Sequence, residues 1–174
     1  MPEWLLAATV LLCLTASGRV GGPAAKSPSQ RTPAETARMV QAAASLLRTE
    51  GAIDKAEIVH MPNEVLTYLR VSPEELERSY YFKLEVREFS ISRLATELGA
   101  ALENSKLRPT TDEGDLRWGC IFYDDKGARV LTVHFDARGR CGFIDGIPVA
   151  GGEQIVEVLA RRCSCLWAGQ YSGE

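Results

Sequence analysis

The sequence has little histidine and none of the short motifs that mark common catalytic or nucleotide-binding sites. Only two of its 174 residues are histidines, His60 and His134. It contains no G-x-S-x-G nucleophile elbow, no G-x-x-x-x-G-K phosphate loop, no G-x-G-x-x-G fingerprint and no H-E-x-x-H helix. These absences argue against an enzyme and give no reason to expect a cofactor.

An excess of charge of one sign is also missing. Charged residues make up 25% of the chain and the formal net charge is -3. A nucleic-acid-binding surface needs clustered positive charge, so we expect no nucleic-acid partner. The longest uncharged apolar run, from Trp4 to Ala16, is shorter than the roughly 20 residues that span a bilayer, so we expect no transmembrane segment in the mature chain.

The N-terminal run has instead the length of a signal-peptide apolar region. Small residues follow it, and Ala16-Ser17-Gly18 offers a cleavage site that would leave Arg19 as the first mature residue. Glu3 stands where a basic residue is usual, and the alternative is an amphipathic or core helix. We predict a signal peptide at 1–18 and export to the periplasm or the medium, followed by a flexible linker at 19–31 rich in Gly, Pro, Ser and Ala.

The remainder, 32–174, is predicted to be a single α+β domain. The T-P-x-E pattern at 32–35 and the S-P-x-E pattern at 72–75 are typical of helix N-termini, and Ser90 is a candidate cap for a further helix. Apolar residues at helical spacing predict helices at about 33–50, 73–79, 90–104 and 153–163.

Alternating apolar and polar residues predict the strands. Short strand-like segments occur at about 57–61, 65–71, 81–88, 116–124, 129–136 and 141–149. The last three are joined by D-D-K-G and D-A-R-G turns and form a C-terminal meander. We expect an antiparallel sheet of about four to five strands with the helices packed on one face.

Four cysteines remain after signal removal: Cys120, Cys141, Cys163 and Cys165. Strand alternation places Cys120 and Cys141 on opposite faces of the meander, which disfavours a bond between them. We predict a disulfide between Cys141 and either Cys163 or Cys165. The rival hypothesis is a structural metal or thiol redox site built on Cys141, Cys163 and Cys165, but the C-x-x-C spacing of such sites is missing, so no metal is expected.

Three other groups of residues are candidate sites. His134 and Asp136 lie two apart on one strand and are the candidates for a hydrolase-type or metal-dependent enzyme. The acidic loop at 112–115 offers oxygen ligands but lacks calcium-loop spacing, so a solvated loop is favoured. A small anion-binding patch is expected if the last hairpin approaches the last helix, from Arg138, Arg140, Arg161 and Arg162.

No catalytic constellation emerges from these residues. The favoured hypothesis is an exported, non-catalytic binding or interaction domain with a protein partner of unknown identity. The two alternatives are the enzyme that uses His134 and Asp136 and the cysteine-based metal or redox site.

Overall fold

The computed structural model describes the chain at 32–65, 67 and 69–171, with side chains described up to 164. The predicted signal peptide and linker therefore lie outside the described residues. Within this part the chain forms four helices and seven strands. The helices are α1 (Pro33–Arg48), α2 (Pro73–Ser79), α3 (Phe89–Asn104) and α4 (Glu153–Tyr171). The strands are β1 (Lys55–His60), β2 (Phe82–Arg87), β3 (Arg108–Pro109), β4 (Leu116–Tyr123), β5 (Arg129–Asp136), β6 (Cys141–Ile144) and β7 (Ile147–Ala150).

The strands form one antiparallel sheet in the order β2-β1-β4-β5-β6-β7-β3. The predicted α+β class is confirmed, but the predicted number of strands is too small. The segment expected as one strand at 141–149 is a hairpin, because Asp145 and Gly146 both take positive φ (48° and 70°) and turn the chain between β6 and β7. Asp-Gly between apolar residues is a strong hairpin signal that the strand prediction passed over.

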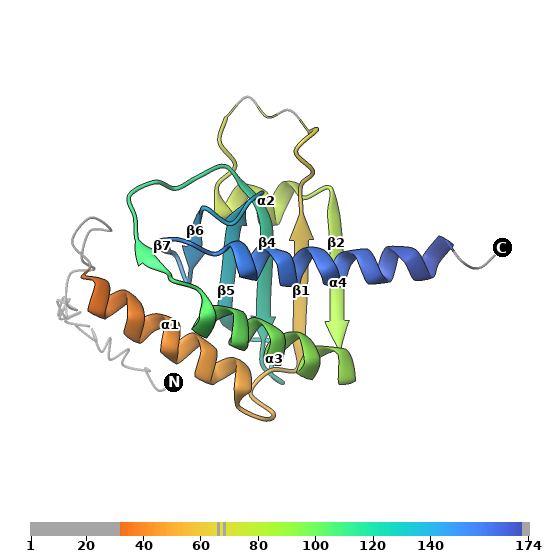
Figure 1. The fold of residues 1–174 in the computed structure, drawn as a ribbon. Helices are drawn as coiled ribbons and strands as arrows, with labels where there is room; N and C mark the ends of the chain where they lie inside the picture. Colours follow the sequence, from red (N-terminus) through yellow and green to blue (C-terminus); the bar gives the residue numbers. More distant parts are fainter. Residues whose placement is uncertain (1–31, 66, 68, 172–174) are drawn as a thin grey trace, which may run out of the picture.

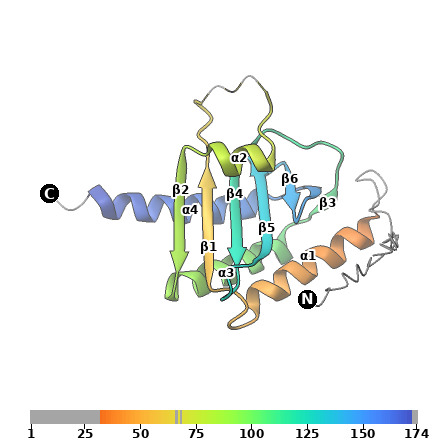
Figure 2. The ribbon, with the colours of Figure 1, turned by 180° about the vertical axis from the view of Figure 1, so that it is seen from behind.

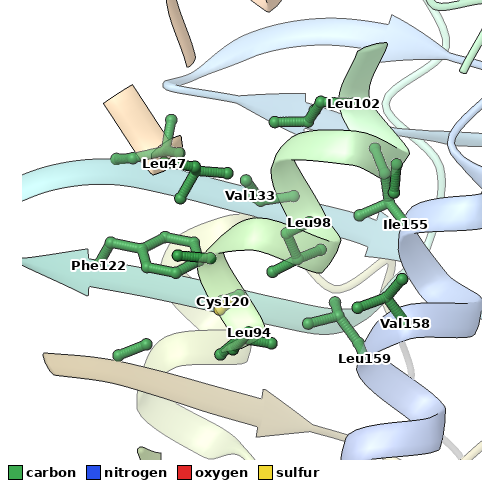
Figure 3. Packing of buried hydrophobic residues seen from close by; sticks show 14 of the residues in the cluster. Leu47, Leu94, Leu98, Leu102, Cys120, Phe122, Val133, Ile155, Val158 and Leu159 are labelled. Atoms are coloured by element: carbon green, nitrogen blue, oxygen red, sulfur yellow. The ribbon is translucent and has the colours of Figure 1, made fainter. Parts of the chain in front are cut away.

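Three long helices, α1, α3 and α4, cover one face of the sheet, which we call the helix face (Figure 1). Their apolar stripes pack with inward side chains of the central strands, as Figure 3 shows for Leu98 and Leu102 of α3, Phe122 of β4, and Leu159 of α4. This cluster is the main core of the domain. It forms because α3 and the meander strands each present one apolar face, which must be removed from water.

The short helix α2 lies on the opposite face (Figure 2), so the expectation that the helices share one face is wrong for α2. A second, smaller core forms beneath it, from Val59, Met61, Val71, Leu76, Leu116 and Ile121. Alternation along β1 and β4 supplies both cores, since successive residues of a strand point to opposite faces.

The capping predictions at Thr32 and Ser72 are confirmed. The Thr32 hydroxyl accepts a hydrogen bond from the Glu35 amide (3.2 Å), and the Thr32 amide donates to the Glu35 carboxylate (2.8 Å), which completes the capping box of α1. The Ser72 hydroxyl caps α2 in the same way through the Glu75 amide (3.2 Å).

Two helix boundaries and one predicted strand differ from the predictions. Helix α3 begins at Phe89 after Glu88, which has positive φ (54°), so Ser90 lies inside the helix and does not cap it. No strand forms in the described part of 65–71, which runs beside the α2 face. Helix α4 continues to Tyr171 instead of ending near Cys163, and Figures 1 and 2 show it extending past the β2 edge of the sheet.

Candidate functional site

The most distinctive hollow on the described surface lies on the helix face, where α4 crosses the sheet near β2. It has a volume of about 430 Å³ and we call it the aromatic pocket. Its walls are His60, Pro62, Tyr81, Phe82, Trp118, Ala160, Cys163 and Ser164. Most of this surface is apolar, as in sites that bury a small molecule or an apolar side chain.

Local structure explains how these residues meet. His60 ends β1, Phe82 begins β2 and Trp118 lies in β4, and the register places His60 opposite both of the others. Their side chains therefore leave the sheet on the same face. Ala160 and Cys163 are three residues apart on α4, so they share the side of the helix that faces the pocket.

The His60 and Trp118 rings are stacked, with centroids 3.8 Å apart and an angle of 17° between their planes. The Nδ1 of His60 lies 2.9 Å from the Arg117 carbonyl oxygen, which can only accept a hydrogen bond, so Nδ1 carries the proton. Nε2 is then the acceptor of the neutral ring. The pocket wall is thus a fixed pair of aromatic rings with one hydrogen-bond acceptor.

The aromatic pocket carries no charge at neutral pH. Its lining contains no Asp, Glu, Lys or Arg. Burial lowers the pKa of His60 below its usual value of 6.5 and raises the pKa of Cys163 to about 11. The imidazole is therefore neutral and the thiol is not ionised, so the site suits a neutral, mainly apolar group. Cys163 is not an activated nucleophile.

Other hollows are less informative. A cavity of about 620 Å³ lies along the segment before α2, beside positions 66 and 68, which are outside the described residues. A third, of about 280 Å³ between the end of α1 and α3, has as much polar as apolar lining.

The enzyme candidates His134 and Asp136 do not share an open cavity. His134 is 2% exposed beneath α2, and its Nε2 lies 3.0 Å from Glu77 Oε1. Asp136 begins the turn after β5, where its carboxylate accepts hydrogen bonds from the amides of Arg138 and Arg140 (2.9 Å each). Both side chains have structural partners.

The acidic loop is likewise occupied by contacts within the chain. Asp112 accepts a hydrogen bond from the Gly114 amide (3.0 Å), and Asp115 pairs with the buried Arg117 (2.6 Å). Within the described residues, no group of three or more His, Cys, Asp or Glu side chains is arranged to hold a metal ion.

The four arginines of the expected anion patch are divided between two places. Arg138 and Arg140 line an open hollow of about 330 Å³ together with Arg117, Asp115 and Asp136. Arg162 pairs with Glu97 of α3, and Arg161 is exposed on α4. The turn between β5 and β6 meets the start of α4, where the Gly152 amide donates to the Gly139 carbonyl (2.7 Å). It does not meet the turns that carry Arg161 and Arg162.

Cys120, Cys141 and Cys163 are free thiols in the structure, so the predicted Cys141–Cys163 bond is not formed. Cys141 lies on the α2 face near Gly114, whereas Cys163 lies on the helix face. Cys163 is also ten residues into α4, which places it about 15 Å along the helix from its start beside β7. The Cys165 side chain lies outside the described residues, so the Cys141–Cys165 alternative stays a prediction. Cys120 and Cys141 do lie on opposite faces, as expected.

Sequence reasoning missed the aromatic pocket. The sequence does contain one indication of the pocket. Ala160, Cys163 and Ser164 are spaced three and four residues apart, which places small side chains on one side of α4 and leaves space between the helix and the sheet. What was missing is the register of β1 against β4, two strands far apart in the chain that bring His60 onto Trp118.

Comparison with known proteins gives no match to a protein family, to a curated protein or to a solved structure. The function is therefore argued from the geometry of this chain. Among the described residues, no helix is both long and apolar enough to cross a membrane.

Proposed function

We propose that this chain is an exported, non-catalytic binding domain that holds a neutral, mainly apolar group in the aromatic pocket. The observation that carries the proposal is an uncharged hollow walled by stacked His60 and Trp118 and roofed by α4. Burying apolar ligand surface there stabilises a complex by roughly 25 cal/mol for each Å² removed from water. The ligand is an aromatic or aliphatic part of a small molecule or of a partner protein.

The non-catalytic part of the proposal follows from the state of the titratable groups. The pocket holds a neutral imidazole and a protonated thiol, and neither a carboxylate nor a cation lines it. General acid–base chemistry needs a group whose pKa lies near the working pH beside a bond that reacts. The lining supplies apolar contact, the neutral ring of His60 and the hydroxyls of Tyr81 and Ser164, which suit binding.

The pocket is tested by filling it. Ser164 is exposed at its rim, so Ser164→Trp places an indole in the pocket without entering the main core. We expect this variant to bind the neutral apolar dye Nile red at least about tenfold more weakly than the unmodified chain, because the indole fills the pocket. Fluorescence titration measures the affinity.

The matched control is Glu157→Trp, which adds the same side chain to an exposed position of the same helix. Its dye affinity is expected to equal that of the unmodified chain. Equal dye affinities for Ser164→Trp and Glu157→Trp would place dye binding elsewhere and remove the basis of the proposal.

The export part of the proposal is supported by the apolar run and the Ala16-Ser17-Gly18 pattern, and it has its own test. The intact mass of the protein purified from its own cells is expected to correspond to a chain that begins at Arg19. A native protein that retains Met1 would contradict export by signal cleavage.

A further inference from the structure

The outer edge of β2 has no partner strand in the described part of the chain, because β2 is the first strand in the sheet order. Its backbone orientation follows from the neighbouring ladder. The Met61 amide donates to the Arg117 carbonyl of β4 (2.9 Å), and the His60 carbonyl accepts from the Tyr81 amide beside β2 (3.1 Å). The backbone N–H and C=O groups of successive residues in a strand point to opposite neighbouring strands. Those of His60 and Ile58 therefore point to β2.

Ile58 lies opposite Leu84, so Leu84 directs its backbone groups inward to β1. The amides and carbonyls of Lys83, Glu85 and Arg87 therefore point outward from the sheet. Such an edge is a template for a further strand, and proteins commonly protect edges with charged side chains.

The charges along β2 alternate in sign, which makes the edge complementary to itself. In an antiparallel pair of β2 strands with Leu84 opposite Leu84, each Lys83 faces a Glu85 of the other copy. The outward-pointing backbone groups of these two residues then form the hydrogen-bonded pairs of the ladder. Opposite charges directly across a strand pair stabilise it, and like charges destabilise it.

The other face of the same register is apolar. Phe82 lies opposite Val86 of the second copy, and both side chains point to the helix face, where Leu84 meets Leu84. Tyr81, which is 72% exposed at the end of β2, lies opposite Arg87. A shift by two residues would bring Lys83 against Arg87 and Glu85 against Glu85, so the charges select one register.

Helix α4 supplies an independent observation. Figures 1 and 2 show its last turns extending beyond β2, past the final strand of the sheet. A second copy joined at β2 would place its own sheet beneath this overhang, on the same helix face. The projecting helix would then cross the seam between the two sheets.

We propose that the chain forms a two-fold symmetric homodimer by antiparallel pairing of β2 with β2, with Leu84 at the two-fold axis. The occupant of this edge is a second copy of the same chain. The dimer does not depend on the aromatic pocket having a ligand, and its test reads association and not dye binding.

Two charge reversals on the full chain test the register. Lys83→Glu places Glu against Glu85 in its homodimer, and Glu85→Lys places Lys against Lys83. We expect the dissociation constant of each homodimer to be at least about tenfold higher than that of the unmodified chain. The reason is that two residue pairs in each dimer then carry like charges. An equal mixture restores opposite charges in both pairs and is expected to dimerise like the unmodified chain. Sedimentation velocity over a range of concentrations measures each species.

The controls separate the interface from folding. Within its own chain Lys83 pairs with Glu57 (3.0 Å), and Glu85 pairs with Arg87 (2.5 Å) and Lys55 (3.9 Å), so thermal unfolding is recorded for both variants. Lys126→Glu and Glu113→Lys make the same charge changes at exposed positions away from β2 and are expected to leave association unchanged. Hydrogen exchange in the unmodified chain adds a measurement without mutation: the amides of Lys83 and Glu85 are expected to become protected as concentration rises.

Three outcomes would overturn the proposal. The first is an unmodified chain that stays monomeric at high micromolar concentration, which would show that β2 does not pair with a second copy. The second is a dimer that both charge reversals leave intact, which places the interface elsewhere. The third is a mixture of the two variants that stays monomeric, with exchange at Lys83 and Glu85 independent of concentration.

Discussion

Glu77 attaches α2 to the sheet through two contacts. One carboxylate oxygen lies 3.0 Å from Nε2 of His134, and the other pairs with Arg129. The contact with His134 is the largest influence on the pKa of Glu77 and lowers it, the Arg129 contact lowers it further, and burial opposes both. His134 is almost fully buried, so loss of Glu77 would remove from the interior the carboxylate that lies 3.0 Å from its Nε2.

Because the folded state lowers the pKa of Glu77, this carboxylate stabilises the fold fully at pH values above its ordinary pKa of 4.5 and less as pH falls through the lowered value. We expect Glu77→Gln to reduce the free energy of unfolding by about 1 kcal/mol near pH 7, with the difference shrinking below about pH 4.5. Urea unfolding at a series of pH values measures this. Glu113→Gln, on an exposed loop, should show no such trend, and a difference for Glu77→Gln that is independent of pH would contradict the ionic account.

At the residue scale, the sequence singled out His134 as a candidate but did not indicate that it is buried beneath α2. Position and spacing showed that His134 and Asp136 share a strand face, which is correct. They did not show that α2 would cover that face, because a seven-residue helix carries too few apolar positions to reveal its partner. Glu77 was not predicted for the same reason.

At the scale of elements, Arg117 of β4 holds the segment between β1 and α2. Its guanidinium donates to the carbonyls of Pro62 (3.2 Å) and Val65 (3.0 Å) and to the Asp115 carboxylate (2.6 Å). The same carboxylate accepts from the Val71 amide (2.9 Å). This ion pair, in which only Arg117 is buried, thus fixes both ends of the connection.

We expect Arg117→Met to loosen this connection while the sheet stays folded. The loss of hydrogen bonds from a buried charged donor is expected to lower the free energy of unfolding by about 1–3 kcal/mol. Hydrogen exchange should become faster at the amides of Val65 and Val71 and stay slow in β4 and β5. Arg138→Met, an exposed arginine, is the control, and unchanged exchange at Val65 and Val71 in Arg117→Met would contradict this role.

Elements with local signals were predicted well. Capping patterns at 32–35 and 72–75 act within one helical turn, so they are readable without the fold. The turns at 124–127 and 136–139 are local in the same sense and give the β4–β5 and β5–β6 connections. The side of the sheet that α2 occupies, the end of α4 and the strand that pairs with β1 depend on contacts between distant parts of the chain.

At the scale of the whole molecule, the two faces of the sheet have different roles. The α2 face carries the smaller core, together with polar pairs that anchor α2 and the segment before it. The helix face carries the main core, and toward β2 it gives way to the aromatic pocket and to the overhang of α4. The features that we assign to binding therefore lie at one edge of the domain, around β2.

The most direct test of the binding proposal is the response of Trp118 to a neutral aromatic probe. Titration of the ¹⁵N-labelled chain with unlabelled indole is expected to shift the Trp118 side-chain signal in a saturable way, with the signal assigned by its loss in Trp118→Phe. The Ser164→Trp variant should show no such shift. An indole signal of Trp118 that stays in place up to the solubility limit of the probe would contradict the account.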